Sequence, residues 1–157
     1  MGKGLKGGLA GLGVLALAAG FPARAEPATA SLTIRIENVS PGGGMLRLGF
    51  YDAARYPDND SAAVASADVK AELGETIVTL HNIVPGTYAI QAFQDINGNG
   101  KMDTSWVGLP LEPFGFSRDA RPHLHKPHFS AVKFAVEAGE NSQTLHLQNS
   151  VSLLASE

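Results

Sequence analysis

Apolar and polar residues alternate with a period of two along much of the chain, which is the pattern of β-strands with one buried face. Residues 31–38 place Leu32, Ile34 and Ile36 on the same face, and residues 45–51 resume the alternation after a glycine-rich turn. The two segments therefore predict a β-hairpin whose inner face belongs to a hydrophobic core.

Further segments extend the strand pattern. Residues 62–70 are ambiguous, because their alanines fit a short helix while their alternation fits an edge strand. The clear strands are residues 75–81, 87–94, 131–136 and 143–147. Six or seven short strands separated by turns predict an all-β fold, an antiparallel β-sandwich of the immunoglobulin-like or transthyretin-like kind. One long irregular loop, residues 95–127, interrupts this pattern, and such loops in compact domains are usually functional.

The first 25 residues differ in character from the rest of the chain. Lys3 and Lys6 give a basic start, a Gly/Ala/Leu run follows, and Ala23-Arg24-Ala25 supplies a small-x-small cleavage motif. The apolar run is too short and too rich in glycine to span a bilayer. We therefore expect residues 1–25 to be a signal peptide. Residues 26–157 would form a single β-sandwich domain, periplasmic or secreted, with no membrane span in the mature chain.

Charge and cysteine content narrow the possible functions. Residues 1–25 contain Lys3, Lys6 and Arg24 but no acidic residue, so the remaining chain has nine basic and 15 acidic residues and a net charge of −6. This balance argues against nucleic acid as a partner. The absence of cysteine excludes a disulfide framework, thiol chemistry and thiolate metal ligands.

One acidic, glycine-rich segment carries the clearest chemical pattern. Asp95, Asn97, Asn99 and Asp103 occupy relative positions 1, 3, 5 and 9, with glycine at position 6, which is the spacing of an EF-hand-type calcium loop. Alternate oxygen-bearing side chains turn inward on such a loop, and glycine makes its sharp bend at positive φ. The spacing predicts a calcium site formed by these four side chains and the backbone carbonyl of Lys101, whose charge would point outward.

The segment departs from the full calcium motif at position 12, where Trp106 stands in place of the usual glutamate. A further oxygen would have to come from water, from a neighbouring loop, or from Glu112 or Asp119. Because the loop has only two formal charges, we expect weak binding, with a Kd on the order of 10⁻⁴ M. The alternative is a plain turn, for which Asn-Gly dipeptides are a strong signal.

Three motifs together resemble a known family. They are Val84-Pro85-Gly86-Thr87-Tyr88-Ala89-Ile90, then Phe93-Gln94-Asp95 with Asn97-Gly98-Asn99-Gly100-Lys101-x-Asp103, and then Gly108-x-Pro110-x-Glu112-x-x-Gly115-Phe116-Ser117. They are similar to the bacterial exported family catalogued as domain of unknown function 2141, over about residues 32–147. The resemblance implies a transthyretin-like or immunoglobulin-like sandwich and brings no established activity. Members often have a histidine where this chain has Gln94, so the resemblance does not extend to a histidine there.

Other groups of residues are weaker candidate sites. His123, His125 and His128 have a spacing with which a zinc or copper site can begin, but their basic neighbours favour a solvated loop. His81 and His146 are expected to be ordinary sheet-face residues. Aromatic residues in the long loop or just after it would either line a groove for a glycan or peptide or pin the loop to the sandwich. They are Trp106, Phe114, Phe116 and Phe129.

The chain contains no recognisable catalytic motif. Ser117 and Ser130 lie in no Gly-x-Ser-x-Gly context, and Glu112 with Asp119 would serve a hydrolase only at a suitable separation. We therefore expect an exported, non-catalytic β-sandwich that binds calcium, with an unidentified protein or glycan partner. The alternatives are a small periplasmic enzyme that uses the loop region from Asp95 to Asp119, and an ion-free structural accessory domain.

Overall fold

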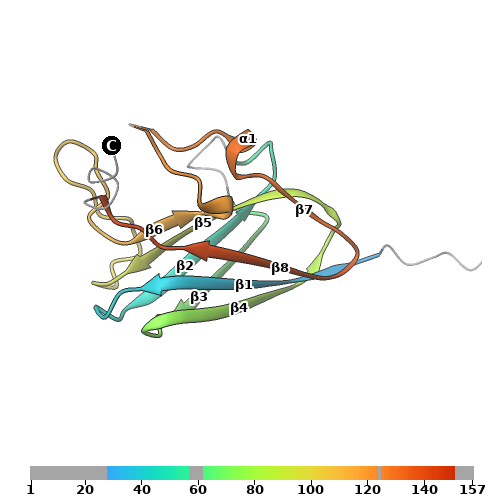
Figure 1. The fold of residues 1–157 in the computed structure, drawn as a ribbon, viewed down its shortest axis with the longest axis horizontal. Coiled ribbons are helices and arrows are strands. Elements are labelled where there is room, and N and C mark those ends of the chain that lie inside the picture. The colour runs from blue at the N-terminus through green and yellow to red at the C-terminus, as the bar shows by residue number, and fades with distance from the viewer. Residues whose placement is uncertain (1–27, 57–61, 124, 151–157) are drawn as a thin grey trace, which may run out of the picture.

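The structure is a computed structural model that describes residues 28–56, 62–123 and 125–150. The signal peptide expected over residues 1–25 therefore lies outside the described residues. Two β-sheets pack face to face (Figure 1), which confirms the predicted all-β sandwich.

The described residues contain eight strands, and most bounds follow the period-two pattern. The strands are β1 (Ala30–Val39), β2 (Met45–Tyr51), β3 (Ala65–Lys70), β4 (Gly74–Ile83), β5 (Gly86–Asp95), β6 (Phe114–Phe116), β7 (Phe134–Val136) and β8 (Gly139–His146). Two short helical turns, η1 (Ser117–Asp119) and α1 (Phe129–Val132), lie between β6 and β7. The ambiguous segment 62–70 contains the edge strand β3. Residues 131–132, expected in a strand, are helical instead, because Phe129 and Val132 pack one helical turn apart against Tyr56.

Two strand pairings depart from expectation. The predicted hairpin of β1 with β2 is wrong, because the turn at residues 40–44 carries the chain from one sheet to the other: β1 pairs with β4 and β8, and β2 pairs with β3 and β5. The small sheet has the order β4-β1-β8, and within it β1 and β8 run parallel, with Ile36 opposite Leu145. The large sheet has the order β3-β2-β5-β6. The first residues of β5, 86–88, pair with β7, and its later residues 91–93 pair with β6. Parallel neighbours need a crossover connection, and here the chain from β2 to β7 forms that crossover.

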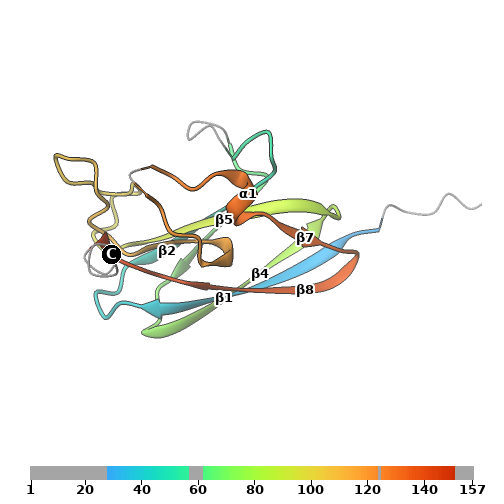
Figure 2. The same ribbon diagram turned by 45° about the horizontal axis from the view of Figure 1, so that its top comes forward.

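The core lies between the two sheets. Leu32, Ile34 and Ile36 of β1 are completely buried, as predicted, and they pack with Leu46 and Phe50 of β2. A second, smaller apolar cluster lies on the outer face of the large sheet, where α1 covers β5 (Figure 2). The large sheet is thus partly covered on both faces.

The long irregular loop leaves the sandwich at one end. Met45 at the start of β2 lies opposite Asp95 at the end of β5, so the loop begins beside the turn at residues 40–44. Both features lie at the end of the sandwich opposite the start of β1 (Figures 1 and 2).

Candidate functional site

Asp95 ends β5 and organises the loop that follows it. Its side chain is completely buried. Oδ1 accepts hydrogen bonds from the backbone N–H groups of Gly98 (2.8 Å) and Asn99 (3.1 Å), and Oδ2 accepts one from Gly100 (2.8 Å). A carboxylate that holds the amides of positions 4, 5 and 6 curls the backbone into a tight turn. Gly100, at position 6, takes the predicted positive φ, 79°.

The other side chains of the predicted calcium loop come together around Asp103. Asn97 Nδ2 donates to Asp103 Oδ2 (2.6 Å), and Asn99 Nδ2 donates to Asp103 Oδ1 (3.0 Å). The two amide oxygens accept backbone N–H groups two residues ahead, from Asn99 at 3.0 Å and from Lys101 at 2.8 Å. The Lys101 side chain is exposed, as expected. The four oxygen-bearing side chains therefore gather on one turn, with amide nitrogens directed at Asp103.

Glu112 closes this turn from outside the nine-residue motif. It is buried, its Oε1 accepts the N–H of Ile96 (2.9 Å), and its Oε2 accepts the N–H of Asp103 (3.2 Å). The N–H of Leu111 also donates to the carbonyl of Asp103 (2.8 Å). Of the two acidic residues considered as an additional ligand, the structure thus brings Glu112 to the loop, whereas Asp119 lies elsewhere, against His146.

Arg47 supplies a positive charge to the base of the loop. Its Nε donates to Asp95 Oδ2 (2.6 Å), and its Nη1 donates to Asp68 Oδ2 on β3 (2.6 Å). Burial raises the pKa of Asp95, but the hydrogen bonds from Arg47, Gly100 and Gly98 outweigh this effect and lower the pKa below its ordinary value. Sequence reasoning missed Arg47. The available signal was a charged residue within the otherwise apolar segment 45–51.

The oxygen atoms of this loop meet only some of the requirements of a calcium ion. Within the described residues, no three His, Asp or Glu side chains are grouped so that they could hold a metal ion. Calcium at this loop would therefore depend on the amide oxygens of Asn97 and Asn99 and on a backbone carbonyl, besides the carboxylates. The two amides would have to rotate to turn their oxygens toward the ion, and the charge of Arg47 would lower the affinity.

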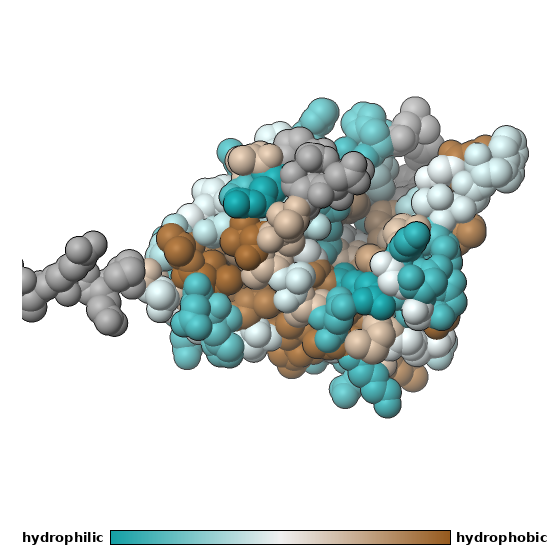
Figure 3. Space-filling view, turned by 180° about the vertical axis from the view of Figure 1, so that it is seen from behind, coloured by the Kyte–Doolittle hydropathy of each residue, from teal (hydrophilic) through white to brown (hydrophobic). Residues whose placement is uncertain are grey.

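The segment between Asp103 and Glu112 forms a short projecting hairpin, residues 104–111, which we call the apolar finger. Thr104 pairs with Pro110, and the N–H of Ser105 donates to the carbonyl of Leu109 (2.8 Å). The finger contains no charged residue, and the Trp106 side chain is 97% exposed. Its other exposed large apolar residues are Val107, Leu109 and Leu111. Figure 3 shows a lobe that projects from this end of the sandwich; its surface is mostly of intermediate hydropathy, with small apolar areas.

The other three aromatic residues considered for a groove do not join Trp106. Phe114 is buried, with its ring centroid 6.1 Å from that of Phe116. Phe129 packs on Tyr56 at a centroid distance of 5.7 Å. These contacts pin the long loop to the sandwich, which is the alternative role expected for them.

Two histidines of the motif lie close to each other, and Ser117 has buried backbone partners. The rings of His125 and His128 lie 5.5 Å apart, and His125 Nδ1 is 3.1 Å from the carbonyl of Lys126. Ser117 Oγ–H donates to the carbonyl of Val132 (2.6 Å) and accepts the N–H of Ile90 (3.0 Å). These two buried backbone contacts give Ser117 a structural role.

Gln94 holds the turn between β1 and β2. It is completely buried, its Oε1 accepts the N–H of Ser40 (2.8 Å), and its Nε2 donates to the carbonyls of Ser40 (2.9 Å) and Gly43 (2.7 Å). Gln94 therefore fixes this turn to the end of β5.

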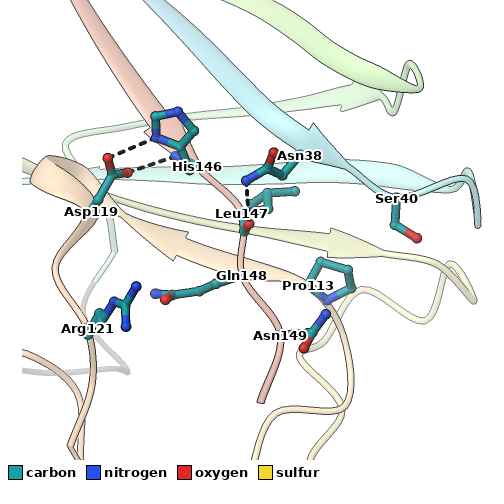
Figure 4. A pocket seen from close by; sticks show the side chains of 9 residues that line it. All are labelled: Asn38, Ser40, Pro113, Asp119, Arg121, His146, Leu147, Gln148 and Asn149. Carbon is teal, nitrogen blue, oxygen red and sulfur yellow. Dashed lines mark hydrogen bonds and ion pairs between the residues drawn. The ribbon is translucent and has the colours of Figure 1, made fainter. Parts of the chain in front are cut away.

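A second polar site surrounds His146, which was expected to be an ordinary sheet-face residue. Its Nδ1 lies 2.8 Å from Asp119 Oδ2, its backbone N–H donates to Asp119 Oδ1 (2.9 Å), and its Nε2 lies 3.2 Å from Glu37 Oε2. A surface pocket of about 560 Å³ adjoins this group (Figure 4). It is lined by Asn38, Ser40, Pro113, Asp119, Arg121, His146, Leu147, Gln148 and Asn149. The three interacting residues are far apart in sequence, so no local motif indicated the site.

The comparisons with known proteins place the chain in a family. A comparison with curated proteins finds no match. Among solved structures, the chain is similar to a pilus-presented adhesin, Cpa, at 11% sequence identity and a TM-score of 0.33; the match covers 78% of this chain and 28% of that one. None of the described helices has the length and apolar character needed to cross a membrane. The family model described as uncharacterized protein conserved in bacteria (DUF2141) matches residues 34–144, and the chain belongs to this family.

Proposed function

We propose that the protein is an exported, non-catalytic β-sandwich module, periplasmic or secreted, that binds calcium weakly through the loop from Asp95 to Asp103. One observation carries this proposal: Asp95, Asn97, Asn99 and Asp103 converge on a single curled turn. A backbone already wound in this way has lost much of the entropy that ion binding would otherwise cost.

Glu112 strengthens the proposal. Its buried carboxylate accepts the backbone N–H groups of both Ile96 and Asp103, so it holds the two ends of the loop together in the curled form. The exposed amides of Asn97 and Asn99 can exchange their contacts with Asp103 for water when they rotate. Arg47 opposes the ion, which fits the expected weak affinity.

The apolar finger is the surface we propose for a partner. Four exposed apolar side chains on a segment that itself contains no charged residue favour an apolar protein surface over a glycan, although Trp106 alone would suit either. The base of the finger is held by Asp103 and Glu112, so an ion at the loop would stiffen the finger and lower the entropy cost of binding.

The ion-free structural role is the second candidate, favoured by the hydrogen bonds of Asp95. Three backbone amides and Arg47 already satisfy this carboxylate without an ion. The catalytic alternative has less support, since Glu112 binds the loop backbone while Asp119 binds His146. The two do not form a carboxylate pair.

Calcium titration of the chelator-treated protein by calorimetry, together with thermal unfolding, tests the proposal. We expect a Kd of about 10⁻⁴–10⁻³ M and a stabilisation of about 2.7 kcal/mol at a hundredfold excess over Kd. Asp103→Asn should weaken binding strongly, because it removes the carboxylate that faces both asparagines.

Two variants serve as controls for the titration. Lys101→Ala should bind calcium at least as well as the unaltered chain, because only the backbone of Lys101 is proposed as a ligand. Arg47→Gln should lower stability in chelator and regain part of it in calcium, since the ion would replace the lost charge beside Asp95. If millimolar calcium gave no heat of binding and no thermal stabilisation, the calcium proposal would be wrong and the ion-free structural role would stand.

A further inference from the structure

One histidine bridges two carboxylates that belong to different parts of the fold. His146 ends β8, Glu37 lies opposite it on the parallel strand β1, and Asp119 belongs to the turn η1. Asp119 Oδ2 is 2.8 Å from Nδ1 and Glu37 Oε2 is 3.2 Å from Nε2. Only an imidazolium can donate from both ring nitrogens, so both contacts are hydrogen bonds only when His146 is protonated.

The turn that carries Asp119 has a strained backbone. Arg118 and Asp119 have φ of 62° and 51°, so two consecutive residues other than glycine occupy the left-handed region. Each such residue costs of the order of 1 kcal/mol. Ser117, immediately before them, is fixed in the interior by Val132 and Ile90. The strained pair is thus flanked by the buried Ser117 and by Ala120, which packs against the smaller apolar cluster, and Asp119 itself is held by His146.

The charged groups around His146 favour its cationic form. Elements packed against it contribute Glu37 and Arg35 on β1, Arg118 and Asp119 on η1, and Arg121 beside the pocket. Arg35 forms an ion pair with Glu75 on β4, directed away from His146 along the sheet. The hydrogen bond with Asp119 raises the pKa of His146 above its ordinary value, and the charge of Glu37 adds to the effect.

We propose that Glu37, His146 and Asp119 form a pH-sensitive latch that holds the strained turn 117–119 tightly against β8 while His146 is protonated and loosens it as the imidazole loses its proton. A neutral ring donates from one nitrogen only, so one carboxylate loses its hydrogen bond and both lose the charge attraction. The backbone N–H of His146 still donates to Asp119 Oδ1 in either state, so the loss of the proton loosens the turn and does not detach it. The strain in Arg118 and Asp119 then favours the loosened conformation.

The latch controls the wall of a pocket. Asp119, Arg121 and His146 line one side of the open surface pocket of about 560 Å³ (Figure 4). Loosening of the turn would move Asp119 and change the shape of the pocket. The protein would then present one form of this surface in mildly acidic surroundings and another in alkaline ones.

Hydrogen exchange of the full chain, followed by NMR between pH 5.5 and 8.5, tests the latch. After correction for the intrinsic effect of pH, protection of the Ala120 and His146 amides should fall by about two- to fivefold across this range, as expected for partly exposed ion pairs. Amides of β2 should show no such fall. In His146→Gln, the amides of residues 120 and 146 should have at every pH the low protection that the unaltered chain shows at pH 8.5. Asp119→Asn should behave in the same way.

His81→Gln is the matched control, because His81 lies on the same outer face of the small sheet but contacts the hydroxyl of Ser31 and no carboxylate. This variant should keep the pH dependence of the unaltered chain. Protection that does not change with pH, or a change that persists in His146→Gln, would overturn the proposal. A ring titration of His146 in the unaltered chain at or below the ordinary pKa of 6.5 would overturn it without any variant.

Discussion

At the scale of single residues, Ser117 joins three segments of the chain through one hydroxyl. Its contacts with Val132 and Ile90 link η1 to α1 and to β5. Ser117→Ala would leave a buried C=O and a buried N–H without this partner, at a cost of about 1–3 kcal/mol for each group. We expect the free energy of unfolding to fall by about 2–4 kcal/mol, as measured by urea denaturation.

Ser130 provides the comparison for this substitution. It lies on the exposed side of α1. Ser130→Ala should therefore change the free energy of unfolding by less than about 0.5 kcal/mol. Equal losses in the two variants would show that the hydroxyl of Ser117 does not join the segments as described.

At the scale of elements, the turn between β1 and β2 offers a pair of glycines in similar conformations. Gly43 has φ 69° with open space where a Cβ would lie, whereas Gly44 has φ 82° and its Cβ would lie 2.1 Å from the carbonyl oxygen of Asp95. Both alanine substitutions meet the left-handed cost of about 1–2 kcal/mol. Only Gly44→Ala also forces the turn away from β5.

We therefore expect Gly44→Ala to be less stable than Gly43→Ala by at least about 2 kcal/mol in urea denaturation, because overpacking against backbone adds to the cost. The amide resonances of Gly98, Asn99 and Gly100 should shift in Gly44→Ala and stay in place in Gly43→Ala. Similar stabilities would mean that the turn does not press on the end of β5.

Elements with local causes could be predicted from the sequence. Residues 45–51 form β2 with the expected bounds, and buried and half-buried positions alternate strictly along it. By contrast, β6 has three residues and exists because it pairs with β5, Phe116 opposite Gln91, which no local pattern shows. The helical turn at 129–132 also depends on a distant residue, Tyr56. Parallel pairing of β1 with β8 likewise follows from the path of the whole chain.

In the candidate calcium site, too, the contacts between residues close in sequence could be predicted, and those that depend on the fold could not. The spacing from Asp95 to Asp103 predicted the curled turn, since the carboxylate and the amides it binds are at most five residues apart. Arg47 reaches Asp95 through the pairing of β2 with β5, and Glu112 returns to the loop only after the finger. The register of two strands and the path of a hairpin decide these contacts, and neither is a local property.

At the scale of the whole molecule, two ionic clusters make stability depend on pH in opposite directions. The pKa of Asp95 is lowered in the folded state, so its contribution is present above the ordinary value of 3.8 and is lost as the pH falls through the folded pKa. The pKa of His146 is raised, so its contribution is complete below 6.5 and is lost as the pH rises through the folded pKa.

These opposite dependences predict a maximum of stability between about pH 4 and 6.5, measured as the urea midpoint from pH 3 to 9. His146→Gln should flatten the decline on the alkaline side while leaving the acid side unchanged, because the latch and the base of the loop lie on different sheets. Asp95→Asn should lower the midpoint at neutral pH and flatten the acid side, since Arg47 then has no charged partner at the end of β5. If the urea midpoint of His146→Gln still declined on the alkaline side, another titrating group would cause the decline. The latch would then make no contribution to the pH dependence of stability.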